Sequence, residues 1–262
     1  MAIDSIQINL ELGKLPDTRK MERLFDSEMA WALYLHKDEY YLEYKPPAFN
    51  EPFWVVRFDR NFETTTLYYG EKLIRTEEGI PSASNPLCYP LDQLLLMHLM
   101  ARRNGILIHA AGMGLSGKGL LFPGRSGAGK STLSRLFLGH RHIEMLSDDR
   151  IALRKINDTF RIFGTPWAGD AGIAENKNFP FSGMFFIRHG SDNTLRELNP
   201  EETLKRLMPV ISVPWYDKSV ISGMLTFCEE LISNVPAYEL YFRPEKEVVP
   251  FLENFLSTKE AP

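Results

Sequence analysis

The chain has 262 residues, of which 44% are hydrophobic and 24% charged, and its formal net charge is −4. This composition is typical of a folded globular protein and excludes a disordered or collagen-like chain. A weakly acidic chain has no overall positive field, so we expect neither nucleic acid nor an anionic membrane as a partner. The longest apolar run, from Leu94 to Met100, is far shorter than the roughly 20 residues that a membrane span needs.

Cysteine usage and the first residues bear on the compartment. Cys88 and Cys228 lie far apart and outside any metal-ligand spacing, which argues against a zinc site and a disulfide framework. The chain starts without a basic head followed by a continuous apolar stretch, so we expect no signal peptide. Buried free thiols in a reducing cytoplasm fit these features best.

The first 80 residues are predicted to form a small β-rich domain, whose role the residues do not indicate. Alternating apolar and polar side chains predict two hairpins. Their strands are expected at 31–35, 40–44, 53–58 and 64–69. Residues 76–90 are rich in Pro, Ser, Asn and Gly, which is typical of a connecting loop.

Residues 81–262 are predicted to form an α/β domain. A helix is expected to begin at Asp92 and to end by Gly105. Apolar runs joined by glycines then predict strands that are buried on both faces. These strands are expected at 106–109, 118–122, 143–146, 151–154, 160–163, 184–187 and 238–242, with helices at 130–138, 200–208, 224–233 and 245–257.

The strongest motif is a phosphate-binding loop of the form G-x-x-x-x-G-K-[ST]. It consists of Gly124, Arg125, Ser126, Gly127, Ala128, Gly129, Lys130, Ser131 and Thr132. An apolar strand precedes it and a helical pattern follows, which is the context that the motif requires. The glycines allow backbone N–H groups to surround phosphate oxygens, Lys130 adds a positive charge, and Ser131 is expected to hold Mg²⁺. We therefore expect a bound nucleotide.

Phosphoryl transfer also needs a carboxylate, and Asp148 and Asp149 follow the strand at 143–146. One can hold Mg²⁺ while its neighbour accepts the proton of an attacking hydroxyl. The alternative is a solvated turn after a strand. His109 ends the strand at 106–109 and is a candidate for the same site, although most single histidines at strand ends are structural.

Together, these residues resemble the HPr kinase/phosphorylase family and its phosphoenolpyruvate carboxykinase relatives. The match consists of His109 fifteen residues before Gly124, the loop itself, and the Asp pair, and it covers roughly residues 105–155. The resemblance implies the P-loop fold of these kinases, with ATP and Mg²⁺ as cofactors. It also implies Asp148 as base, Asp149 and Ser131 at the metal, and His109 beside the reaction centre.

The expected activity is ATP-dependent transfer of phosphate to a Ser or Thr hydroxyl of a protein or peptide. Thr132 stands where the bacterial enzymes usually have Glu, and their ExRGxG signature is missing, so the resemblance does not extend to HPr as the acceptor. Two alternatives stay open: a carboxykinase-like kinase of small molecules, and a nucleotide-binding regulatory ATPase without transfer. Residues 164–170 are predicted to form either a lid or a tight turn, and Arg125 and Arg188 are candidates for neutralising transition-state charge.

Overall fold

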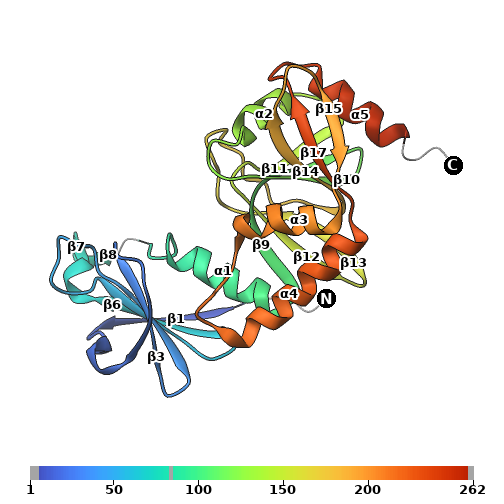
Figure 1. Ribbon diagram of the computed structural model, residues 1–262. Coiled ribbons are helices and arrows are strands. Elements are labelled where there is room, and N and C mark those ends of the chain that lie inside the picture. The colour runs from blue at the N-terminus through green and yellow to red at the C-terminus, as the bar shows by residue number, and fades with distance from the viewer. Residues whose placement is uncertain (1–5, 83–84, 259–262) are drawn as a thin grey trace. The chain divides into compact units, whose positions relative to one another are not determined.

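The structure, a computed structural model, describes residues 6–82 and 85–258 (Figure 1). The chain is mixed α/β, with several sheets and few helices, as the sequence predicts. It divides into two compact units, Met1–Leu99 and Met100–Pro262. Within the described ranges, no helix is long and apolar enough to cross a membrane.

The first unit is built on a six-stranded sheet with the strand order β1-β6-β5-β4-β3-β2. Its strands are β1 (Gln7–Gly13), β2 (Glu22–Asp26), β3 (Trp31–His36), β4 (Glu39–Tyr44), β5 (Trp54–Phe58) and β6 (Thr64–Gly70). Both predicted hairpins are confirmed, because β3 pairs with β4 and β5 pairs with β6 in antiparallel fashion. In the β3–β4 turn, Lys37 and Asp38 have φ angles of +48° and +63°, as two-residue turns between twisted strands require.

The predicted connector is not entirely a loop. It contains part of a third, short hairpin, β7 (Arg75–Glu77) and β8 (Ile80–Ser82), whose turn is made by Glu78 and Gly79 at positive φ. Positions 83 and 84 of the connector lie outside the described residues. Short 3₁₀ turns occur at Thr18–Lys20 and Glu71–Leu73.

Helix α1 (Leu91–Arg102) follows and begins one residue before the predicted start, so Asp92 lies in its first turn rather than at its N-cap. Its buried His98 stacks on Phe62 of the first unit, with ring centroids 3.9 Å apart, so this histidine is a core residue. The expectation of two buried thiols holds for Cys228 only, because Cys88 is exposed; both cysteines are free.

The second unit contains a nine-stranded sheet that curves back on itself. Its strands are β9 (Gly105–Leu115), β10 (Lys118–Pro123), β11 (Ile143–Ser147), β12 (Arg150–Ile156), β13 (Thr159–Gly164), β14 (Asn178–His189), β15 (Thr194–Glu197), β16 (Ile211–Ser212) and β17 (Ala237–Phe242). The main order is β10-β9-β12-β13-β14-β17-β15, and β10 also pairs with β14, which closes a ring of five strands. β10, β14 and β17 run parallel, so their carboxyl ends lie at one edge.

Helices cover the sheet through two hydrophobic clusters. These helices are α2 (Lys130–Phe137), α3 (Pro200–Leu207), α4 (Lys218–Asn234) and α5 (Val248–Thr258), with a 3₁₀ turn at Met208–Val210. Residues of α3 and α4 pack in one cluster, and those of α2 and α5 pack in the other. Along β14, Phe186 belongs to the first cluster and its neighbours Phe185 and Ile187 to the second. A strand buried on both faces explains the continuous apolar run in the sequence.

Helix α4 begins six residues before the predicted start at residue 224. The cause is Asp217, whose side chain accepts a hydrogen bond from the Ser219 backbone N–H at 3.1 Å. Asp217 is nearly buried and is also bound by Arg102 at 2.7 Å. An N-cap carboxylate held in this way fixes where the helix starts.

Candidate functional site

The glycine-rich loop lies between β10 and α2, at the carboxyl edge of the parallel strands. Gly127 and Gly129 have φ angles of +80° and +99°, a region that side chains disfavour. A Cβ on Gly124 would lie 2.8 Å from the Ala128 Cβ, so the first glycine is required for a close approach within the loop. The predicted glycines are thus needed for the shape of the turn.

Helix α2 starts without a side-chain cap, because its N-cap residue is Gly129. The first N–H groups of a helix have no partner within the helix, and they carry the positive end of its dipole. An uncapped helix start beside a glycine loop is an arrangement that suits phosphate oxygens.

Lys130 is held within the loop. Its buried side chain donates hydrogen bonds from Nζ to the carbonyl oxygens of Gly124 at 2.9 Å and Arg125 at 3.1 Å. Burial lowers the pKa of this amine, and the negative charges of Asp149 and Asp148 oppose that shift. The ammonium group is therefore placed at the loop before any ligand arrives.

Asp149 and His109 face the same region. The His109 Nε2 lies 3.4 Å from the Asp149 Oδ1, and the two side chains are 27% and 29% exposed. The backbone holds them together, because His109 pairs with Arg150 across β9 and β12 and its carbonyl accepts the Gly124 N–H at 3.1 Å. Burial and the charge of Lys130 lower the pKa of His109, which favours the neutral imidazole.

Asp148 is arranged quite differently from Asp149. It is only 1% exposed, and its carboxylate accepts three backbone N–H bonds. The donors are Gly169 and Ile173 to Oδ1, at 2.8 and 3.2 Å, and Ala171 to Oδ2, at 2.6 Å. A carboxylate occupied in this way anchors the segment that contains those amides.

The segment anchored by Asp148, residues 169–173, overlaps the end of residues 164–170, for which the sequence predicts a lid or a tight turn. The Ser147 hydroxyl donates to the Trp167 carbonyl at 2.9 Å, and Arg135 of α2 donates to the Asp170 carbonyl at 2.7 Å. A Cβ on Gly169 would lie 2.7 Å from the Asp148 Oδ2. The segment is therefore fixed against the end of β11 and the side of α2, which favours the turn.

The remaining predicted residues occupy separate places. Ser131 is half-buried at the start of α2, while Arg125, Ser126 and Thr132 are exposed. Arg188 lies at the end of β14 and binds Glu239. The structure thus brings Lys130, His109 and Asp149 together, whereas Asp148 is enclosed by backbone and Arg188 belongs to another cluster.

The donor set can accommodate Mg²⁺ only with help from a ligand. Among the described residues, no group of three or more His, Cys, Asp or Glu side chains forms a metal site. Mg²⁺ is commonly held by one or two carboxylates together with substrate phosphates. The Asp149 carboxylate and the Ser131 hydroxyl are the candidates, and they fit that chemistry when a nucleotide supplies phosphate oxygens.

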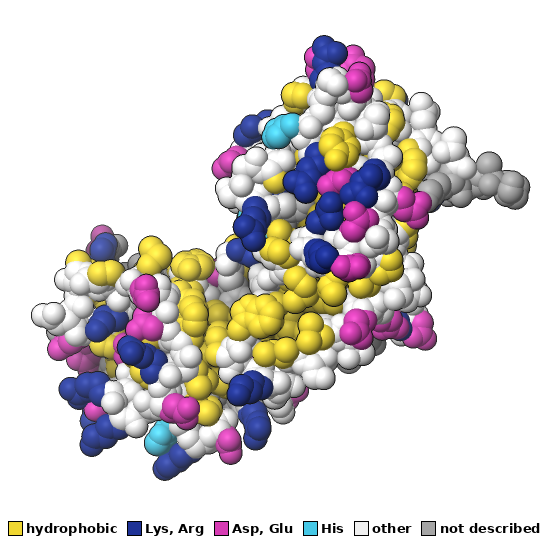
Figure 2. Space-filling view, in the orientation of Figure 1, with side chains coloured by type: hydrophobic (Ala, Val, Ile, Leu, Met, Phe, Trp, Pro, Cys, Tyr) yellow, Lys and Arg dark blue, Asp and Glu magenta, His cyan; other side chains and the backbone are white. Residues whose placement is uncertain are grey.

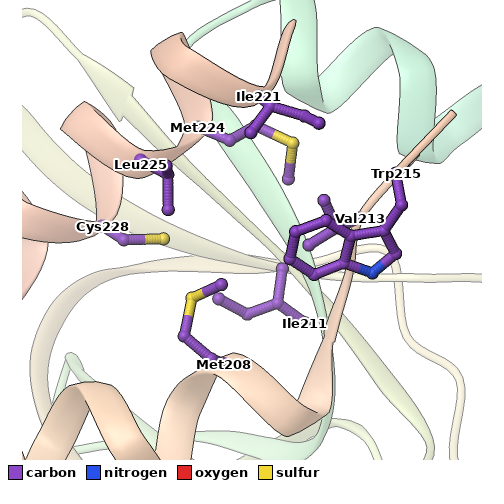
Figure 3. A pocket seen from close by; sticks show the side chains of 8 residues that line it. All are labelled: Met208, Ile211, Val213, Trp215, Ile221, Met224, Leu225 and Cys228. Carbon is purple, nitrogen blue, oxygen red and sulfur yellow. The ribbon is translucent and has the colours of Figure 1, made fainter. Parts of the chain in front are cut away.

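An apolar pocket lies elsewhere in the second unit. In Figure 3 the side chains that α4 contributes face Met208 and Ile211, with the Trp215 indole to one side. The pocket is lined by Met208, Ile211, Val213, Trp215, Ile221, Met224, Leu225 and Cys228. None of these belongs to the phosphate loop or to the acidic pair, so the pocket is not part of the candidate site.

Comparisons with known proteins add little to this geometry. No family model matches the chain, and no curated protein matches it. Among solved structures, the chain is similar to the HPr(Ser) kinase/phosphatase from Coxiella burnetii, with 13% sequence identity and a TM-score of 0.38. The match covers 59% of this chain and 99% of that chain. Because a similarity at this score carries no argument, the function proposed for this protein depends on the geometry of its own site.

Sequence reasoning did not find the bonds around Asp148, nor the role of Ser147. Two adjacent aspartates look equivalent in a sequence, but neighbouring side chains at the end of a strand point in different directions. A usable signal was present in Gly164, Gly169 and Gly172, because a glycine-rich segment after a strand suits close approach to another group.

Proposed function

We propose that this protein is an ATP-dependent phosphotransferase of the HPr kinase type, which phosphorylates a Ser or Thr hydroxyl of a protein or peptide. One observation carries the proposal: the buried Lys130 amine, held by the glycine loop, faces the Asp149 and His109 pair. A phosphate-binding loop opposite a carboxylate is the minimum that phosphoryl transfer requires.

Each group has a role in the proposed reaction. The loop amides and the start of α2 bind the β- and γ-phosphates, and Lys130 neutralises their charge. Ser131 and Asp149 would hold Mg²⁺, which would supply further neutralisation of the phosphate oxygens. The acceptor hydroxyl forms a bond to the γ-phosphorus as the bond to the β-phosphate oxygen breaks, and ADP leaves.

The hydroxyl proton goes to the His109 imidazole, whose Nε2 lies 3.4 Å from Asp149, because the Asp149 carboxylate would be occupied by the metal. Both side chains are partly open to solvent, and the lowered pKa of His109 keeps its imidazole neutral and able to accept a proton. Asp148 was the expected base, and that role stays a prediction. Its enclosure by three backbone N–H groups favours a positioning role instead.

The test uses ATP labelled on the γ-phosphate and a library of serine-containing peptides, with Mg²⁺ present. Wild-type protein is expected to label peptide. Lys130→Ala should lose both nucleotide binding and labelling, whereas Asp149→Asn should bind nucleotide and label peptide about 10²-fold to 10⁴-fold more slowly. Asp158→Asn, an exposed carboxylate beyond β12, is the matched control.

Normal labelling by Asp149→Asn would overturn the role given to Asp149. Label that appears only as free phosphate would overturn transfer to a hydroxyl and indicate an ATPase.

A second candidate function is nucleotide binding without transfer. The specific observation in its favour is that the carboxylate of Asp148, the expected base, already accepts three backbone hydrogen bonds. Wild-type protein that binds a fluorescent ATP analogue, depends on Lys130 to do so, and consumes no ATP would support this candidate over the kinase.

A further inference from the structure

A cluster of three arginines surrounds one buried carboxylate in the second unit, apart from the phosphate loop. Glu239, in the middle of β17, is only 3% exposed. Its Oε1 accepts from Arg188 Nε at 3.0 Å and from Arg206 Nη2 at 2.9 Å. Its Oε2 accepts from Arg196 Nε and Nη2 at 3.1 and 2.8 Å, and from the Tyr241 hydroxyl at 3.3 Å.

The cluster carries more positive charge than Glu239 needs. Glu202 on α3 binds Arg196 at 2.9 Å, so three guanidinium groups face two carboxylates and one positive charge is in excess. The Nε of Arg206 is buried and has no hydrogen-bond partner among the described residues. In Figure 2, basic and acidic side chains are interleaved over the face where Figure 1 shows α3 and β17.

Arg188 makes the fewest hydrogen bonds of the three arginines. It contacts Glu239 through Nε alone, and its side chain is 53% exposed. Within the described part of the chain, its Nη1 and Nη2 make no hydrogen bond. A guanidinium group binds phosphate or carboxylate through two parallel N–H bonds, and here one of its edges remains available for that. Glu239 holds the other edge, so the orientation of the fork is set in advance, which lowers the entropic cost of binding.

The position of Arg188 separates this cluster from the nucleotide site. Arg188 is next to Ile187, and the Ile187 side chain would lie 3.7 Å from a Cβ on Gly129 of the phosphate loop. Because neighbouring residues of a strand point to opposite faces, Arg188 lies on the other face of the sheet, where Arg206 of α3 meets Glu239. It is still at the carboxyl edge of the parallel strands β14 and β17.

We propose that Arg188, oriented by Glu239 and backed by Arg196 and Arg206, is a second anion site that binds a phosphate or carboxylate group. The excess charge of the cluster matches such a group, and the free edge of Arg188 matches its two oxygens. The site does not depend on the phosphotransferase activity, because neither Lys130 nor Asp149 belongs to it.

The test is a titration of the full chain, followed by NMR, at about 50 mM salt so that screening is modest. Lys130→Ala serves as the background, which removes phosphate binding at the loop. Four probes are compared: inorganic phosphate, a phosphoserine peptide, the same peptide with Asp at that position, and the same peptide with Ser. The first three are expected to bind and the last is not. Comparison of the first two shows whether a free ion or a peptide-borne group is preferred.

The variants identify the binding residue. Arg188→Gln is expected to weaken binding about tenfold or more, and Arg188→Lys, which keeps the charge but loses the fork, by a smaller factor. Lys205→Gln is the matched control, because Lys205 is a 70% exposed cation on α3 that pairs with Glu201. It should change affinity by less than about twofold.

Equal binding by Arg188→Gln and its background would overturn the proposal, as would a Lys205→Gln variant that weakens binding equally. Failure of all three anionic probes to bind at millimolar concentration would overturn it as well. Circular dichroism of each variant shows whether it is folded. If Arg188→Gln does not fold, Arg188→Lys replaces it in the test, because it retains a cation beside Glu239.

Discussion

The bonds around Asp148 support a quantitative prediction about the segment that it anchors. In the wild-type protein, the Ala171 N–H donates to the Asp148 Oδ2 at 2.6 Å. Replacement of Asp148 by Asn keeps one oxygen for Gly169 and Ile173 but puts an amide donor against that N–H. A buried donor left without an acceptor costs about 1–3 kcal/mol, and the loss of the charge weakens the bonds that remain. We therefore expect Asp148→Asn to destabilise residues 169–173 by about 2–4 kcal/mol.

Hydrogen exchange followed by mass spectrometry measures this local effect directly. Because about 1.4 kcal/mol corresponds to a factor of ten, exchange of these amides should accelerate by about 30-fold to 1,000-fold. Asp149→Asn is the matched control, since its carboxylate contacts side chains rather than these amides. Unchanged exchange in Asp148→Asn, or equal acceleration in Asp149→Asn, would refute the anchoring role.

Three further predictions follow from packing and charge. Burial raises the pKa of Glu239, but hydrogen bonds from its three arginines outweigh burial and lower it from 4.5 to about 2. This carboxylate thus contributes stability that is complete above about pH 4.5 and is lost as the pH falls through 2. The shift corresponds to about 3 kcal/mol, so urea titrations from pH 7 to 2 should show that loss in wild type and not in Glu239→Gln. Gly169→Ala should destabilise the second unit by about 1–3 kcal/mol in denaturant titrations, because its Cβ would meet Asp148. Gly139→Ala is the comparison variant, because a Cβ there meets open space and the substitution tests the effect of a positive φ alone. Burial raises the pKa of Cys228 to about 11, so a thiol reagent at neutral pH should modify the exposed Cys88 and reach Cys228 only after unfolding; rapid modification of both thiols in native protein would contradict the structure.

Much of the fold could be predicted from local sequence patterns. The hairpins of the first unit follow from alternation on either side of Lys37 and Asp38, and α2 follows from the helical spacing after the loop. The ends of the helices and strands could be predicted less well. β14 begins at Asn178, before its apolar run, because pairing with β13 continues the strand, and such pairing depends on distant residues that no local window contains.

The candidate site could be predicted only in part from the sequence, because only some of its residues lie close together in the chain. The motif places Lys130 in a loop, since its glycines and the flanking strand and helix are contiguous in the sequence. The different surroundings of Asp148 and Asp149 could not be predicted from the sequence, because they depend on where the backbone of residues 169–173 passes. The cluster around Glu239 was also missed: its arginines come from β14, β15 and α3, and only the folded sheet brings them together.

The central position of β9 in its sheet has a consequence for folding during synthesis on the ribosome. β9 pairs with β10, β11, β12 and β16, so residues 105–115 receive their last partner only when Ser212 has been synthesised. Until then, this apolar strand has an exposed edge at Leu107 and Ile108, which is a known hazard for aggregation. The first unit, whose strands all precede Leu91, completes its pairing before β9 leaves the ribosome. Slow or interrupted translation between residues 115 and 212 should therefore favour capture by chaperones.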